Sequence, residues 1–162
     1  MRGVLALVLV GAISSCAAAD DPDDGAAAVV EIIDGDTLVA RFGSRTETIR
    51  LIGIDTPETV HPDRPVECFG PEATAFLTDL LPPGTGIRVH RDVVARDHFD
   101  RLLGYVYRTS DGLFVNAEII AQGLGRPLSI APNDIYAVEF VKRATEAERA
   151  NRGVWAACRA GR

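Results

Sequence analysis

Short apolar runs separated by turn residues fill the chain between residues 29 and 54. Three such runs are present, at residues 29–33, 37–42 and 46–54. They are divided by Asp34-Gly35-Asp36 and Gly43-Ser44, which are typical of hairpin turns. We therefore predict a meander of three strands. Gly53 indicates a bulge or a close backbone approach in the last strand, and Pro57 ends the pairing because it has no N–H group.

A change in the spacing of apolar residues predicts the first helix. Apolar residues recur at the helical period from residue 73 to residue 81, and Pro71 is acceptable in a first helical turn. Pro82-Pro83-Gly84 then ends the helix. Two more strands are predicted after it, at residues 86–91 and 102–108.

Two further helices are predicted nearer the C-terminus. Asn116 has the residue type of an N-cap for a short helix that Gly123 closes. Asn133 and Asp134 are predicted to open a last helix, which ends at Gly153. Its expected apolar line is Phe140, Val141, Ala144 and Ala147. Five short strands with helices on one side indicate an α+β protein with a five-stranded OB-fold β-barrel and about three α-helices.

The first 19 residues are typical of an export signal. Residues 4–13 form an uncharged apolar run of ten residues, which is too short to span a bilayer. Ile13-Ser14-Ser15-Cys16 resembles a bacterial lipobox, in which residues 1–15 are removed and Cys16 is acylated. Ala17-Ala18-Ala19 fits ordinary signal peptidase instead. We favour the lipobox, and either route places the mature protein outside the cytoplasm, anchored to the membrane or secreted.

The rest of the chain is predicted to be an acidic disordered linker at residues 20–27, one domain at 28–158 and a tail at 159–162. With the four linker acids and Arg2 set aside, residues 28–162 hold 16 basic and 19 acidic residues, a formal charge of −3 against −6 for the whole chain. This balance excludes binding of nucleic acid by bulk positive charge. Attraction for a polyanion therefore has to be local.

The chain has three cysteines, Cys16, Cys68 and Cys158. Both processing routes remove Cys16 from pairing, and disulfides persist in exported proteins. We therefore predict a Cys68–Cys158 disulfide, which closes a long loop. The alternative is two free thiols.

Two stretches place acidic residues where predicted strands end. Asp36 follows an Asp-Gly pair at the start of the second strand, and Asp55 and Glu58 follow the third strand. Hard cations such as calcium take several oxygen ligands, which Asp36 and Asp55 can supply from neighbouring strands. Arg50 and Asp55 face the same site only if an irregularity at Gly53 shifts the alternation of side chains. The alternative is a simple hairpin turn with a surface salt bridge.

These two stretches, I-D-G-D-T at 33–37 and R-L-I-G-I-D-T-P-E-T at 50–59, resemble those of the thermonuclease, or staphylococcal nuclease-like, family. The resemblance continues in order from residue 28 to about residue 156. It takes in His61-Pro62, Glu67, Phe69 to Ala73, Asp97 to Tyr105, Val115 to Glu118, Gln122 to Leu124 and Gly153 to Trp155. Each motif alone is weak, but their collinear series is specific.

The resemblance implies roles for individual residues. Arg50 and Arg101 would face the scissile phosphate from opposite sides, and Glu58 would be the base that activates the attacking water. This agrees with the chemistry, because guanidinium matches phosphate bidentately and a carboxylate can accept a proton from water. The implied calcium ligands are Asp36, Asp55 and the backbone carbonyl of Thr56, with Asp34 acting on the waters of the metal.

The chain also departs from the family pattern in the expected substrate-binding residues. A lysine–tyrosine pair before the second arginine is replaced by His98 and Phe99, so a hydroxyl group is lost. Two tyrosines that flank the base fall near residues 128–131, which contain no aromatic residue. Stacking on a base is worth about 1–3 kcal/mol, so we expect weaker nucleotide binding with the chemistry preserved.

We therefore expect a calcium-dependent, extracytoplasmic nuclease that hydrolyses phosphodiester bonds in DNA, RNA or both with low sequence specificity. We expect it to be a monomer that meets the membrane only through a lipid on Cys16. The alternative is a non-catalytic OB-fold module that binds nucleic acid or a protein partner. A degenerate copy should have lost some of five residues, and all are present: Asp36, Arg50, Asp55, Glu58 and Arg101.

Overall fold

The computed structural model describes residues 25–59 and 65–158. The predicted export signal, the lipidation site Cys16, the tail at 159–162 and most of the acidic linker lie outside these residues. Within them, none of the helices combines the length and the apolar character needed to cross a bilayer.

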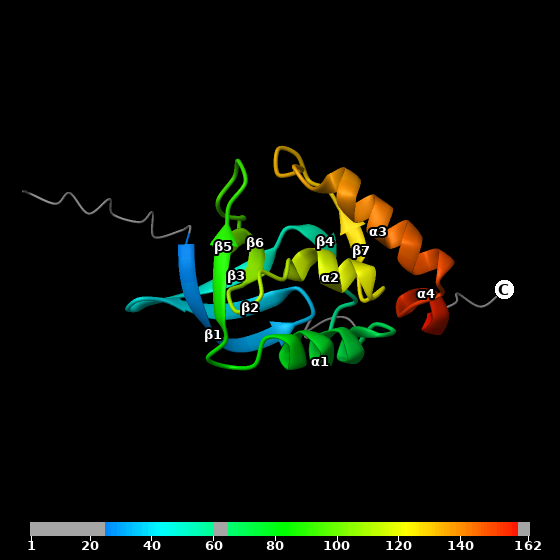
Figure 1. The fold of residues 1–162 in the computed structure, drawn as a ribbon, viewed down its shortest axis with the longest axis horizontal. Helices are drawn as coiled ribbons and strands as arrows, with labels where there is room; N and C mark the ends of the chain where they lie inside the picture. Colours follow the sequence, from blue (N-terminus) through cyan, green and yellow to red (C-terminus); the bar gives the residue numbers. More distant parts are fainter. Residues whose placement is uncertain (1–24, 60–64, 159–162) are drawn as a thin grey trace, which may run out of the picture.

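Five strands close into a barrel in the order β1-β2-β3-β6-β5 (Figure 1). The strands are β1 (Gly25–Asp34), β2 (Thr37–Phe42), β3 (Arg45–Leu51), β5 (Gly86–His90) and β6 (Leu102–Arg108). Neighbouring strands are antiparallel except β3 and β6, whose parallel pairing closes the barrel. The predicted five-stranded OB-fold barrel is confirmed. Fully buried aliphatic side chains from every strand but β1 fill its interior, among them Leu38, Ile49, Leu51, Ile87, Val89 and Leu102.

The first strand is longer than predicted. Gly25 to Ala28 pair with residues 86–89 of β5, so residues 25–27, which we assigned to the linker, belong to the barrel. These small residues show no apolar pattern, and their place in the strand comes from backbone pairing alone.

The helices lie outside the barrel (Figure 1). The first, α1 (Gly70–Leu80), has Pro71 in its first turn as predicted and packs against β1. The others are α2 (Val115–Ala121), α3 (Ala137–Arg149) and a short α4 (Val154–Ala157), and α2 contacts both α3 and β6. Gly123 closes α2 with a φ of 71°, as predicted.

The prediction that Asn116 caps α2 is wrong. Asn116 lies inside the helix and is fully buried. Its Oδ1 accepts a hydrogen bond from the Val106 N–H, and its Nδ2 donates to the carbonyls of Ile52 and Gly104. The side chain therefore satisfies backbone groups of the barrel, since buried polar groups need partners.

The boundaries predicted for the last helix are also wrong. The helix begins at Ala137, and the Asn133 side chain instead exchanges two hydrogen bonds of 2.8 Å with the backbone of Val94. Val141 is exposed, whereas the other three residues of the expected apolar line are buried. The helix ends at Arg149, and Gly153 precedes the separate helix α4.

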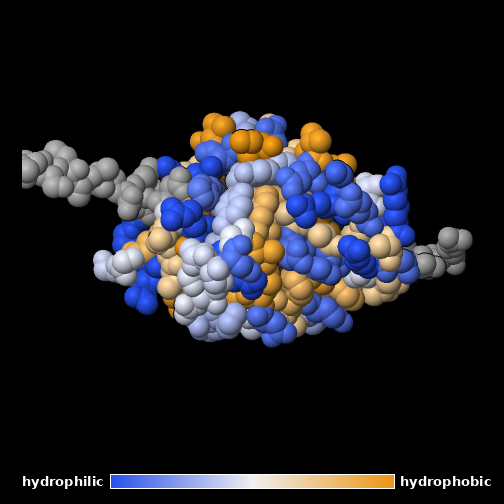
Figure 2. Space-filling view, in the orientation of Figure 1, coloured by the Kyte–Doolittle hydropathy of each residue, from blue (hydrophilic) through white to orange (hydrophobic). Residues whose placement is uncertain are grey.

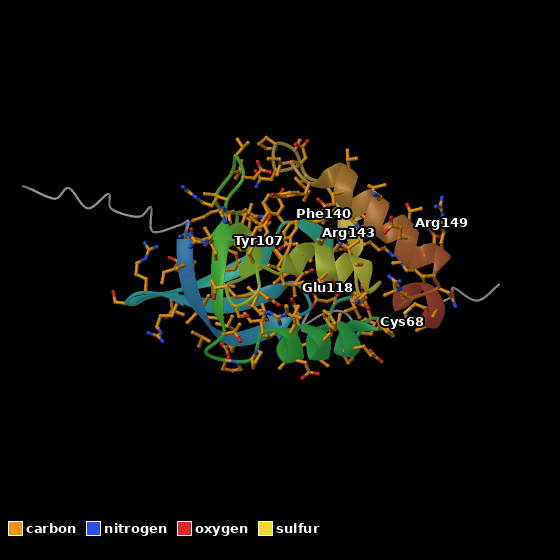
Figure 3. All side chains as sticks on the ribbon, viewed as in Figure 1. Cys68, Tyr107, Glu118, Phe140, Arg143 and Arg149 are labelled. Atoms are coloured by element: carbon orange, nitrogen blue, oxygen red, sulfur yellow. A yellow bond between two sulfur atoms is a disulfide. The ribbon has the colours of Figure 1, made fainter. Side chains whose placement is uncertain are left out.

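The chain breaks its pairing after β3 and forms a second, two-stranded sheet from β4 (Gly53–Asp55) and β7 (Arg126–Leu128). Gly53 has a φ of 82°, and a Cβ atom at this position would lie 2.2 Å from Cε2 of Phe140. The close approach indicated by Gly53 is thus confirmed, against the α3 side chain labelled in Figure 3. After the break, Asp55 ends β4 and lines one cavity together with Asp36 and Arg50.

The predicted disulfide between Cys68 and Cys158 is present, with 5.8 Å between the two Cα atoms. Figure 3 shows Cys68 beside α4 at one end of the molecule. The bond joins residues 90 positions apart, and the chain-entropy model gives such a loop roughly 4 kcal/mol of stabilisation.

Candidate active site

One cavity of about 230 Å³ gathers the acids and arginines singled out in the sequence. Its walls come from the ends of strands β1, β3 and β4 and from the turns and loops next to the strands. Its lining residues are Asp34, Asp36, Arg50, Asp55, Thr56, Pro57, Glu58, Glu67 and Arg101. The sequence predicted every ionisable residue of this set as a site residue except Glu67, which entered only as one member of the motif series.

Asp36 is the buried centre of the cavity, and its side chain is only 7% exposed. It lies in the turn between β1 and β2, and its Oδ2 accepts hydrogen bonds from the Thr56 N–H (2.9 Å) and hydroxyl (3.0 Å). Arg50 Nη2 lies 3.0 Å from the same oxygen. A buried carboxylate needs such partners, because an unpaired charge is costly in the interior.

Arg50 is fixed at the end of β3 by four contacts. Its Nη1 donates to the carbonyls of Leu51 (2.7 Å) and Ile54 (3.0 Å). Its Nη2 bridges the carboxylates of Asp36 and Asp55, at 3.0 and 3.3 Å. Arg50 and Asp55 thus share one site, and the break at Gly53 provides the shift in side-chain alternation on which this depended.

Asp34 lines the same cavity beside Asp36. Its Oδ1 accepts a hydrogen bond of 3.0 Å from the Asp36 N–H. Burial, followed by the negative charge of Asp36, raises the pKa of Asp34 to about 6, although hydrogen bonds from Asp36 and Thr37 act in the opposite direction. The pair is a concentration of negative charge, which a cation would relieve.

The donor atoms around Asp36 and Asp55 fit a hard cation. Carboxylate and carbonyl oxygen atoms are the ligands that calcium prefers, and calcium completes its shell with water. Among the residues that the structure describes, no three His, Cys, Asp or Glu side chains converge as a metal-binding group. Asp36, Asp55 and the Thr56 carbonyl would therefore have to share the cation with water. The Asp55 side chain is 61% exposed, so water has access to the site.

Arg101 reaches the cavity from the loop before β6. Its Nε donates to Asp97 Oδ2 at 2.8 Å, and its backbone N–H donates to Asp97 Oδ1 at 2.9 Å. Burial disfavours the charged form of Asp97, but the hydrogen bonds from Arg101 and Phe99 and the charge of Arg101 outweigh it, so the pKa of Asp97 is lowered. The ion pair uses Nε. The two terminal amino groups of Arg101 are therefore suited to binding an anion.

Glu58 follows Pro57 and is hydrogen-bonded to a second acidic residue, Glu67. The Glu58 N–H donates to Glu67 Oε2 at 3.2 Å, and the Glu67 N–H donates to the Glu58 carbonyl at 2.9 Å. Glu58 Oε1 accepts a hydrogen bond of 2.8 Å from the Thr59 N–H. No local sequence pattern predicts this pairing, because the two partners are nine residues apart.

A second cavity, of about 410 Å³, adjoins the first and shares Arg50 and Arg101 with it. Its wall is largely aliphatic, with Val94, Leu103, Leu128 and Ile130. Figure 2 shows apolar side chains gathered on the loop tips after β5 and before α3, where several exposed apolar residues lie: Val93, Val94, Phe99, Ile130 and Ile135. The two cavities together offer a charged site beside an apolar one.

The two residues predicted to bind substrate occupy different places around this second cavity. His98 lines it. Phe99 is not among the lining residues; it is 67% exposed, and its ring lies 5.4 Å from the guanidinium carbon of Arg101. Phe99 therefore lies over the catalytic arginine candidate, where a cation–π contact is worth about 0.5–1 kcal/mol.

Comparison with known proteins identifies relatives over most of the chain. The family model described as staphylococcal nuclease homologue matches residues 48–157. A thermonuclease of Staphylococcus intermedius is 35% identical over 127 residues, which cover 78% of this chain and 74% of that protein. A thermonuclease of Staphylococcus hyicus is 31% identical, with 78% and 73% covered. Endonuclease YncB of Bacillus subtilis (strain 168) is 32% identical over 124 residues, which cover 76% of this chain and 58% of that protein.

Proposed function

Because this chain belongs to the staphylococcal nuclease homologue family, and is therefore a phosphodiester hydrolase, we propose that it is a calcium-dependent extracytoplasmic nuclease acting on DNA, RNA or both. One observation carries the proposal. Two acidic residues suited to a hard cation, two arginines and a glutamate line the same cavity of about 230 Å³. The non-catalytic alternative would be expected to lack some of these groups.

The arginines bind and orient the phosphate. Arg50 is held by backbone carbonyls and by Asp36, so its guanidinium is preorganised before the substrate arrives. Arg101 lines the same cavity from the loop before β6 and can offer its terminal amino groups to the phosphate. Donors fixed at the place where negative charge develops stabilise a transition state more than a ground state.

Glu58 is the base. Its carboxylate accepts a proton from a water molecule while the water oxygen bonds to phosphorus and the P–O ester bond breaks. The leaving oxygen departs towards the positive charge of Arg101 and takes up a proton from solvent water. Calcium bound by Asp36, Asp55 and the Thr56 carbonyl would supply further positive charge at the phosphate and a place to hold the water.

The aliphatic cavity supports low sequence specificity. The amide of Asn133, at its edge, is already committed to the backbone of Val94 in both directions. A base entering the cavity would therefore meet mainly aliphatic side chains such as Leu128 and Ile130, which do not read base edges. Contact of this kind is weaker than stacking on an aromatic ring.

The disulfide supports a place outside the cytoplasm, because such bonds form and persist in oxidising compartments. Attachment through Cys16 stays part of this proposal. Mass spectrometry of the mature protein would decide it: an acylated Cys16 at the N-terminus supports a lipoprotein, and an unmodified Asp20 supports ordinary secretion.

The test of the proposed function is cleavage of DNA and RNA by the mature domain, with calcium and with EDTA. We expect cleavage that EDTA abolishes and calcium restores, and Asp36→Ala or Asp55→Ala should lose both cleavage and calcium binding while the domain stays folded. Undiminished cleavage in EDTA would contradict the assignment of calcium, and no cleavage of either DNA or RNA would contradict the proposed activity.

A further inference from the structure

The proposed base, Glu58, has its backbone held by one other residue of the cavity. The two hydrogen bonds between Glu58 and Glu67 run in opposite directions, one from each backbone N–H. Only one of them uses a side chain, the Glu67 carboxylate. Glu67 therefore acts on the position of Glu58 through the Glu58 backbone, and this side-chain contact can be removed by mutation.

Glu67 is next to a cysteine of the disulfide, in a segment with an unfavourable backbone. Phe69, two residues on, has a φ of 73°, a left-handed conformation that side chains other than glycine rarely adopt. The Glu67 carbonyl accepts a hydrogen bond from the Gly70 N–H as the chain turns into α1. A covalent bond at Cys68 therefore holds a turn that its own residues do not favour.

The other cysteine of the disulfide, Cys158, follows α4, which contacts the strand that pairs with Asp55. The Val154 N–H of α4 donates to the Gly123 carbonyl at 2.8 Å, which ties α4 to the end of α2. The Arg126 guanidinium lies 4.4 Å above the Trp155 ring of α4, and Arg126 pairs with Asp55 between β7 and β4. Figure 3 shows Cys68 at this end of the molecule, beside α4. The α4 region is thus linked to Asp55 through Arg126, and to Glu58 through the disulfide and Glu67.

We propose that Glu67 is a positioning residue for Glu58, and that the Cys68–Cys158 disulfide keeps Glu67 in place, so that the rate of cleavage depends on the oxidation state of the two cysteines. The proposal rests on the proposed role of Glu58 as the base. Cys68 is exposed, so a small dithiol can reach the sulfur pair. Reduction adds two electrons and two protons to the pair, and the dithiol becomes its own disulfide.

The experiment compares four proteins with and without dithiothreitol, in calcium and well below their melting temperatures. They are the wild type, Glu67→Ala, Glu67→Gln and the double variant Cys68→Ser/Cys158→Ser. Loss of alignment by about 1 Å can cost up to about 100-fold in rate, so we expect kcat to fall at least about tenfold in Glu67→Ala, in the double variant and in the reduced wild type. The KM and the calcium affinity should stay within about twofold, because Glu67 is assigned no contact with phosphate or cation.

The variant Glu67→Gln separates positioning from charge. It keeps an oxygen that can accept from the Glu58 N–H, so it should retain a near-wild-type kcat. If Glu67→Gln is as slow as Glu67→Ala, or if calcium affinity falls in both, Glu67 acts through its charge and the proposal is wrong. Ile87→Val, a buried change in β5, is the control for lost stability alone, and its kcat should not change.

A second readout does not depend on activity. Backbone order parameters should fall from about 0.85 towards 0.6 at Glu58 in the reduced protein and in Glu67→Ala, and should stay high at Thr56, whose N–H is bonded to Asp36. Unchanged order at Glu58 would overturn the proposal. If the oxidised wild type cleaved nothing, the proposed function would fail, and these order parameters would still decide whether Glu67 and the disulfide position Glu58.

Discussion

The two arginines of the cavity are held in different ways. Arg50, at the end of a barrel strand, makes four contacts, two of them to backbone carbonyls, and its side chain is 15% exposed. Arg101 has one ion pair, to Asp97 of its own loop, and is 31% exposed. The barrel thus fixes one guanidinium before substrate arrives, whereas the other is held by one ion pair and by contact with the Phe99 ring of its own loop. A change near Arg50 should disturb fold and function together, and a change near Arg101 should disturb function alone.

The largest effect is expected for Arg50→Ala, which tests whether this side chain supports both the fold and the activity. It leaves Asp36 buried without its cation, and breaking a buried pair in this way costs about 3–5 kcal/mol. Loss of a donor at developing charge costs roughly 10²–10³ in rate. We expect a lower kcat, a higher KM and a lower melting temperature, measured by steady-state kinetics and calorimetry. The exposed Arg41→Ala is the control, and a wild-type melting temperature for Arg50→Ala would contradict the assigned role.

The kcat of Arg101→Ala should be nearly as low as that of Arg50→Ala, but its stability should be close to that of the wild type. It removes a partly exposed ion pair, which contributes about 1 kcal/mol or less, and a donor that meets the leaving oxygen. We expect kcat to fall roughly 10²–10³-fold with KM little changed. Arg101→Lys should not restore the rate fully, because an ammonium group cannot bind phosphate bidentately. A large loss of stability would mean that the two arginines are held alike.

A smaller effect is expected for Asp97→Asn, which tests whether one side chain positions Arg101. Asn can still accept from the backbone but loses the charge that pairs with the guanidinium, so we expect kcat to fall about tenfold, corresponding to about 1.4 kcal/mol. The matched control is Asp111→Asn, which breaks the Arg108–Asp111 ion pair away from the cavity. Equal rates for the two variants would show that Arg101 does not need Asp97.

The smallest effect is on the pH dependence of stability. Asp97 has a folded pKa below its ordinary value of 3.8, so its ionised form stabilises the folded state above that value. This contribution is lost as the pH falls through the folded pKa. The melting temperature of the wild type should exceed that of Asp97→Asn at pH 6 by an amount that shrinks below about pH 4. A difference that grows on acidification would have the wrong sign.

The strands and the acidic cavity could be predicted because their signals are local. The Asp-Gly-Asp turn and the apolar runs on either side specify the hairpin that places Asp36, whatever surrounds it. Asn116 and Asn133 were misread for the opposite reason. Both have the residue type of a helix cap, but each satisfies backbone groups from distant segments, 64 residues away for Asn116 and Ile52. Local propensity contains no information on such partners.

Two other features, the β4–β7 pair and the bond between Glu67 and Glu58, could not be predicted from a short stretch of sequence. The strands β4 and β7 have three residues each, too few for a pattern, and Gly53, the first residue of β4, indicated only an irregularity at this position. Glu67 lies in a segment without periodicity, so its bond to the Glu58 N–H became visible only in three dimensions.

The disulfide also changes what a single cut in the chain can do. Residues 68 to 158 form a covalent ring, and the exposed loop at 129–132 lies within it. A protease that nicks this loop opens the ring but does not divide the molecule, because the piece that carries α3 and α4 stays tethered through Cys158. Phe140 would thus remain tethered near Gly53, and the nicked protein would migrate as one chain until a reductant released the smaller fragment.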